Sequence, residues 1–191
     1  MSRNGSGVDR RVADSRNRIA NAIIELGQQF PIDSLTIGQL TAHAGISRST
    51  FYAHFASLGD YLERSFGNMI EGHARHAGAE PQNRCQLLAV SSILAHISRA
   101  PKYVAAITRS KYRPRMLAEG ERRLAIVADE KLRELRPDLS AARRAAMATY
   151  AAGGFMGTLR NWMEGGLARS CSDVEADLQA LTAALVNQAR P

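Results

Sequence analysis

Apolar residues recur at helical spacing along most of the chain. Near the N-terminus, intervals of four, three and four residues separate Ile19, Ile23, Leu26 and Phe30. The same intervals separate Val174, Leu178, Leu181 and Leu185 near the C-terminus. Such spacing places each set on one face of a helix. Runs that alternate with period two are few, so the sequence predicts an all-α fold.

Prolines, glycines and capping residues mark where the helices begin and end. We expect residues 1–8 to be a loose arm and the first helix to span about residues 9–28. Three short units follow, opened by a Thr36–Gln39 capping box, by Ser47 and by Ser57. The third opens a helix that runs through Ile70.

The sequence after Ile70 predicts further helices. Pro81 is expected to open a helix to about Arg99. The other expected helices span about residues 101–109, 114–135, 140–165 and 172–185, the last beginning with a Ser172–Glu175 capping box. We therefore divide the chain into an N-terminal unit, 1–56, and a larger C-terminal unit, 57–191.

Composition agrees with an ordinary globular protein. The 191 residues are 45% hydrophobic and 23% charged. Two cysteines, Cys85 and Cys171, make no disulfide framework, so we expect a reduced cytoplasmic protein. No uncharged stretch is long enough for a membrane span, and the N-terminus lacks the apolar segment of a signal peptide.

The net charge of +7 is unevenly distributed. A basic excess suits a polyanionic partner. Residues 102–123 carry most of it, with seven Lys or Arg and two Glu. Three interpretations of this segment stay open. We favour a solvated helix face; alternatively the segment attracts an anionic ligand or lies close to DNA.

Residues 36–55, TIGQLTAHAGISRSTFYAHF, form a helix-turn-helix pattern. Gly45 permits the positive φ that a steep crossing of two short helices requires. We expect an inward apolar set of Leu40, Ala44, Ile46, Phe51 and Phe55. The outward polar set is Arg48, Ser49, Thr50, Tyr52 and His54. These side chains suit the hydrogen-bonding edges of a DNA major groove.

The predicted DNA contacts divide into two kinds. Helix N-termini bind phosphate, so we assign phosphate contacts to Thr36, Ser47, Ser57 and also Tyr52. Arg48, Ser49 and Thr50 are predicted to contact the edges of the bases, and His54 lies on the same predicted face. Further phosphate contacts are expected from Arg10, Arg11, Arg16 and Arg18.

From about Ser15 to Ile70 the chain resembles the TetR family of transcriptional regulators. The resemblance rests on Ile23, Leu26, Phe30, Leu35-Thr36-Ile37, Leu40, Ala44-Gly45-Ile46-Ser47, Thr50-Phe51-Tyr52 and His54-Phe55. Two positions differ from the family's usual pattern: Thr41 stands where a small residue is common, and Leu58 stands where a phosphate-binding Lys is common.

The resemblance implies a C-terminal unit that binds a small ligand and dimerises through its last two helices. Apolar and tyrosine residues suggest a ligand pocket of Phe66, Ile70, Leu94, Tyr103, Ile107, Met116 and Tyr150, although plain core packing is the alternative. The dimer interface is expected at Gly157, Arg160, Trp162, Leu178, Leu181 and Leu185, the alternative being that these leucines cover the monomer core.

We therefore expect a ligand-responsive repressor that binds a pseudo-palindromic operator on double-stranded DNA as a homodimer. The alternatives are an activator and a structural or adaptor protein on the same scaffold. No cofactor, membrane partner or enzymatic activity is expected. His73, His76, His96 and Cys85 make no tight metal-binding motif, and phosphate-loop and Gly-x-Ser-x-Gly motifs are missing. Ligand, operator and regulated genes stay open.

Overall fold

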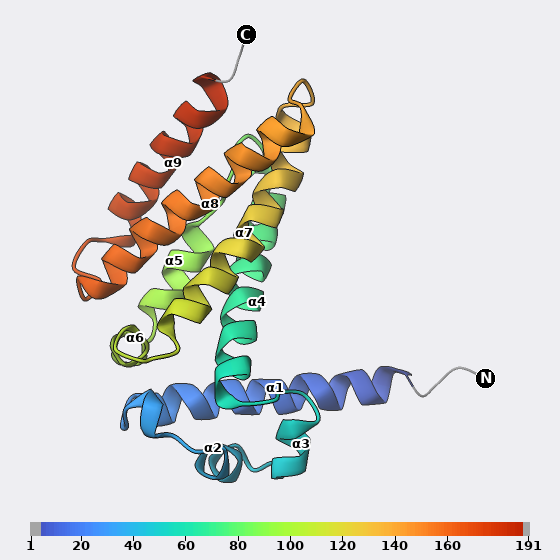
Figure 1. The fold of residues 1–191 in the computed structure, drawn as a ribbon, viewed down its shortest axis with the longest axis vertical. Helices are drawn as coiled ribbons and strands as arrows, with labels where there is room; N and C mark the ends of the chain where they lie inside the picture. The colour runs from blue at the N-terminus through green and yellow to red at the C-terminus, as the bar shows by residue number, and fades with distance from the viewer. Residues whose placement is uncertain (1–4, 189–191) are drawn as a thin grey trace.

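The computed structural model describes residues 5–188, with the side chains of residues 13–187. Helix α1 (Gly5–Gly27) is followed by a 3₁₀ turn, η1 (Ile32–Ser34), and by two short helices, α2 (Ile37–Ala44) and α3 (Arg48–Tyr52). Figure 1 shows α2 and α3 beneath α1 at one end of an elongated molecule. The long helix α4 (Leu58–Ala79) rises from them into the rest of the protein.

The larger part is also helical. After a second 3₁₀ turn, η2 (Pro81–Asn83), come α5 (Ser91–Ser98), α6 (Pro101–Thr108), α7 (Arg113–Leu135), α8 (Ala141–Glu164) and α9 (Cys171–Gln188). Helix α7 packs along both α4 and α8, and α6 packs on α1. Residues 5–188 contain no strand, which confirms the all-α prediction. In this range no helix is long and apolar enough to cross a membrane.

Several predicted boundaries agree with the structure, and three do not. The first difference is at the N-terminus, where α1 begins at Gly5 and so includes residues predicted as a loose arm. Adding residues to an existing helix is much easier than nucleating one, so this polar segment extends the helix without an apolar face of its own.

The second difference lies after Pro81. The predicted helix from Pro81 to about Arg99 is wrong, because helical structure is limited to η2 and to α5, which begins at Ser91. Between them, residues 87–90 are all buried. A surface helix cannot bury four consecutive side chains on one face, so this segment enters the core without helical structure.

The third difference concerns the last helix. Ser170 caps α9, since its Oγ accepts a hydrogen bond from the Asp173 N–H at 3.1 Å. The predicted cap, Ser172, lies inside the first turn and is exposed. Both serines precede an acidic residue by a few positions, so the local pattern fits either register.

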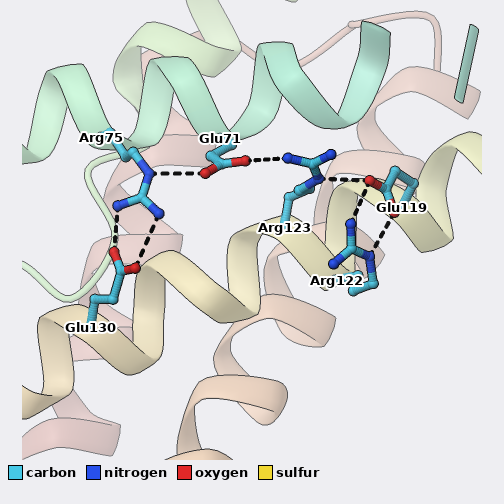
Figure 2. A network of polar contacts seen from close by, with 6 residues as sticks. All are labelled: Glu71, Arg75, Glu119, Arg122, Arg123 and Glu130. Carbon is cyan, nitrogen blue, oxygen red and sulfur yellow. Dashed lines mark hydrogen bonds and ion pairs between the residues drawn. The ribbon is translucent and has the colours of Figure 1, made fainter. Parts of the chain in front are cut away.

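Helices α4 and α7 are joined by a network of six charged side chains (Figure 2). The Arg123 guanidinium binds Glu119 at 2.6 Å and Glu71, on α4, at 2.7 Å. Arg122 also binds Glu119, while Arg75 on α4 binds both Glu71 and Glu130. The network therefore connects the helix that follows α3 to the centre of the C-terminal unit.

This network predicts an acid-sensitive contribution to stability. The hydrogen bond from Arg122 lowers the pKa of Glu119, burial opposes it, and Arg123 adds to the lowering, to about 2 from an ordinary 4.5. Because the folded-state pKa is the lower one, the stabilisation is complete above about pH 4.5 and is lost as the pH falls towards 2.

We expect Glu119→Gln to reduce the free energy of unfolding by about 1–3 kcal/mol at pH 7. Urea denaturation between pH 7 and pH 3 should show a smaller loss of stability for this variant than for the wild type. Glu80→Gln, which removes an exposed carboxylate, serves as the control and should follow the wild type. Parallel pH profiles for Glu119→Gln and wild type would contradict the assignment.

Candidate nucleic-acid interface

Helix α2 is fixed at both ends by local chemistry. At its start, the Thr36 Oγ1 accepts from the Gln39 N–H at 3.2 Å, and the Gln39 side chain accepts from the Thr36 N–H at 2.9 Å. At its end, Gly45 has φ 61° and ψ 39°. The Arg18 guanidinium donates to the Gly45 carbonyl at 2.7 Å and so ties α1 to this turn. The predicted capping box and glycine turn are both present.

Replacing Gly45 with alanine should destabilise the protein by about 1–2 kcal/mol, because an L side chain is strained at positive φ. The added methyl group would also meet the Arg18 guanidinium. Gly72→Ala is the matched control, since its position inside α4 has open space. Urea denaturation should show Gly72→Ala to be stabilising by up to about 1 kcal/mol. Equal effects of the two substitutions would contradict this account.

Helix α3 is anchored from below by aromatic side chains. Phe51 is fully buried, and its ring centroid lies 5.5 Å from that of Phe55. Phe55 in turn packs edge-on against Tyr61 of α4, with centroids 5.0 Å apart. Burial raises the pKa of Tyr61 to about 12, against a smaller lowering by Ser65. A continuous aromatic contact therefore links α3 to α4.

The other residues predicted to face inward also contact the core. Leu40 and Ala44 are buried, and Ile46 is half-buried against the hydrophobic core to which they belong. Thr41, which differs from the usual family pattern, is buried as well. Its hydroxyl donates to the Ile37 carbonyl at 2.8 Å, so its polar atom is satisfied within α2.

The opposite side of α3 is polar and accessible. Arg48, Ser49 and Tyr52 are exposed, Tyr52 by 56%, whereas Thr50 and His54 are half-buried. Ser47 caps the helix by accepting from the Thr50 N–H at 3.0 Å. Its hydroxyl is also 2.7 Å from that of Ser49 and 2.8 Å from that of Thr50.

Arg48 reaches back over the start of α2. A Cβ built on Gly38 would lie 2.5 Å from an Arg48 Nη atom, so any larger residue at position 38 would displace the guanidinium. Gly38 is therefore part of the candidate interface, although sequence reasoning missed it. A glycine in the first turn of a short helix, ten residues before an arginine, was the available signal.

The three capped N-termini differ in charge. The first turns of α2 and α3 contain no acidic residue, whereas Asp60 lies in the first turn of α4. The Asp60 carboxylate accepts from the Ala56 N–H at 2.9 Å. The N-terminal amides at Ser57 thus already face an anion, which makes this end less suitable for phosphate than those at Thr36 and Ser47.

At position 58, where a phosphate-binding lysine is common in the family, this chain has a leucine with a structural role. Leu58 is buried and packs into the core. Six residues further along α4, Arg64 donates to the His54 carbonyl at 3.0 Å and lies 5.3 Å from the centre of the Phe55 ring. Arg64 supports the end of α3, a role that the sequence analysis did not assign.

The predicted arginine arm is only partly described. The side chains of Arg10 and Arg11 lie outside the described residues. Arg16 is exposed on α1, whereas Arg18 is occupied with the Gly45 carbonyl. Arg18 therefore supports the turn of the helix-turn-helix, and a phosphate contact by its other N–H groups stays a prediction.

The structure places the predicted ligand residues partly in the core and partly at the surface. Ile70, Leu94, Ile107 and Met116 are buried in the continuous core, and Phe66 and Tyr103 are half-buried against it. Tyr150 is 73% exposed, so most of its side chain lies outside this core. Three hollows on the protein surface are lined by other residues.

The predicted dimer residues also divide into two groups. Trp162 and Leu178 are buried within the chain, and the indole N–H of Trp162 donates to the Arg169 carbonyl at 2.9 Å. Both therefore pack into the chain's own core, and for Leu178 this agrees with the alternative that the leucines cover the monomer core. Leu181 is 67% exposed, Arg160 is exposed, and Gly157 and Leu185 are half-buried.

Two of the histidines considered as metal ligands, His73 and His96, lie next to each other. His73 lies 2.6 Å from the Ser92 hydroxyl, and its ring centroid is 4.7 Å from that of His96. Burial lowers the pKa of both rings, and neighbouring charges lower it further. Among the described residues, no three or more His, Cys, Asp or Glu side chains come together as a metal site.

No protein-family model and no curated protein sequence matches the chain. Solved structures do match. The dihydroxyacetone kinase operon activator DhaS is 16% identical, with a TM-score of 0.66 over 91% of this chain and 97% of that one. A TetR transcriptional regulator from Rhodococcus sp. RHA1 is 14% identical, with a TM-score of 0.63 over 93% and 98%.

A third similar structure is Thermus thermophilus FadR, a TetR-family repressor solved with lauroyl-CoA. It is 16% identical, and its TM-score is 0.57 over 92% of this chain and 95% of that one. These likenesses cover both the N-terminal unit with its helix-turn-helix and the helical remainder. The chain therefore has the fold of the TetR-family transcriptional regulators.

Proposed function

We propose that this protein is a cytoplasmic transcription regulator that binds a pseudo-palindromic DNA operator as a homodimer. The observation that carries the proposal is the exposed polar face of α3. It bears Arg48, Ser49 and Tyr52 on a helix whose opposite face is held by buried Phe51. A rigid scaffold with hydrogen-bonding groups outward is what base reading in the major groove requires.

The proposed dimer uses the outer surfaces of α8 and α9. On these surfaces Tyr150 and Leu181 are large, mostly apolar side chains that are strongly exposed. Gly154 and Gly157 on α8 have open space where a side chain would stand, so another helix can approach closely. A two-fold pair would carry two copies of α3 to two half-sites.

Regulation by a ligand is proposed to act through α4. This helix is linked to α3 through the aromatic contacts of Phe51 with Phe55 and of Phe55 with Tyr61, and it contacts α7 through the network of Figure 2. A ligand that favours a different tilt of α4 would change the spacing of the two α3 helices. Such coupling between sites is typically about 1–3 kcal/mol. We favour repression, with activation as the alternative.

Selection from a pool of random duplexes tests DNA binding directly. At about 0.15 M salt, the full-length protein should enrich an inverted repeat, and its affinity should fall steeply as salt is added. A structural or adaptor protein on this scaffold would enrich no sequence. Failure to enrich any sequence, even at low salt, would overturn the proposed function.

A further inference from the structure

A hollow of about 400 Å³ lies where the N-terminal unit meets α6. One wall is formed by the end of α1 and the loop after it, including Phe30. The facing wall is α6, where Ala105 and Ala106 lie between Lys102 and Arg109. The two alanines leave room that larger side chains would fill.

The charge of this hollow is positive. Lys102 and Arg109 are seven residues apart, which places them on one side of α6 about 10 Å from each other along its axis. Neither forms an ion pair among the described residues. Other cations of the basic segment do: Arg113 binds Glu164 at 2.7 Å, and Arg115 lies 3.7 Å from Glu63.

The one carboxylate in this lining is already engaged. Asp33 accepts from the Ser110 hydroxyl at 2.7 Å and from the Lys111 N–H at 3.1 Å. Burial would raise its pKa, but these hydrogen bonds and the charge of Lys111 lower it overall. Asp33 thus stays ionised and occupied at the rim, while the Lys102 and Arg109 charges stay available.

The hollow also presents an apolar surface. Phe30 is 48% exposed although it is a large aromatic residue. A flat apolar body could lie against its ring and the methyl groups of Ala105 and Ala106. We propose that this hollow binds a small organic anion with a flat apolar body, such as an aromatic carboxylate, whose charge is held by Lys102 or Arg109.

A ligand bound in this hollow would change the packing of α1 against α6. The end of α1 and α6 touch closely here: a Cβ built on Gly27 would lie 2.8 Å from the Tyr103 ring. A ligand in contact with both walls would therefore alter how α1 is held against α6. Its effect on DNA affinity rests on the proposed function, whereas binding itself does not.

Isothermal titration of the full-length protein without DNA tests the site, with 2-naphthoate as the probe. We expect saturable binding at millimolar concentration or below, and at least tenfold weaker binding by Lys102→Gln with Arg109→Gln. Arg143→Gln, an exposed arginine at the start of α8, is the control and should bind like the wild type. Ala105→Leu, which fills the hollow and keeps both charges, should also weaken binding at least tenfold.

Two further probes separate the charge from the apolar body. The neutral 2-naphthalenemethanol and inorganic phosphate should each bind at least tenfold more weakly than 2-naphthoate. Equal affinity for either, unchanged affinity of the double variant, or no saturable binding of 2-naphthoate would overturn the proposal. Because no DNA is present, these results are independent of whether the protein recognises an operator.

Discussion

The double substitution Arg48→Ala with Tyr52→Ala should abolish specific operator binding while the protein stays folded and dimeric. Arg48 is proposed to contact base edges, and one such contact contributes about 1–3 kcal/mol. Tyr52 is proposed to add a phosphate hydrogen bond of about 1 kcal/mol. Since each half-site loses both contacts, the affinity for the selected operator should fall at least a hundredfold, at about 1.4 kcal/mol per factor of ten.

Fluorescence anisotropy with the selected duplex measures this loss. Both side chains project from the protein surface, so circular dichroism and sedimentation should match the wild type. Arg84→Ala, which removes an exposed arginine just after η2, beyond the end of α4 that is far from α3, should leave operator affinity within about twofold, because salt screens its long-range attraction for DNA. Unchanged affinity of the double variant would refute the assignment of α3 as the reading helix.

The substitutions Tyr150→Glu and Leu181→Glu together should convert the dimer to monomer. Burying two carboxylates in an apolar interface costs several kcal/mol unless each finds a partner. We expect the dimer dissociation constant to rise at least a hundredfold. Operator affinity should fall with it, because a monomer offers one α3 to two half-sites.

Sedimentation velocity at micromolar concentration distinguishes the two states. Ala79→Glu, at the exposed end of α4, adds one carboxylate outside the proposed interface and should leave the dimer intact. A glutamate variant that still sediments as a dimer would place the interface elsewhere. A wild-type protein that is monomeric at this concentration would contradict the proposed assembly as a whole.

The features that could be predicted are those that depend only on residues close together in the sequence. The caps at Thr36, Ser47 and Ser57 require residues only three positions apart, and each forms as expected. Proline in the first turn of α6 and α7 likewise marks where those helices begin. Spacing also separated buried Phe51 from exposed Arg48, Ser49 and Tyr52 on α3, whereas Thr50, predicted to face outward, is half-buried.

Features that depend on distant contacts were less predictable. Trp162 and Leu178 lie on helices with apolar residues on more than one side, so periodicity alone could not say which residues face the chain's own core. Arg18 reaches a carbonyl 27 residues away, a contact that no local motif indicates. The buried residues of the predicted ligand set share their apolar character with the core and could not be told from it.

The most direct test of the central claim is to alter the major-groove edge of the selected operator. Replacing its purines with 7-deazapurines removes the N7 acceptors that lie in that groove and leaves Watson–Crick pairing intact. If α3 reads the major groove, substitution within the half-sites should weaken binding at least tenfold, and substitution outside them should not. Unchanged affinity for the fully substituted operator would contradict the account.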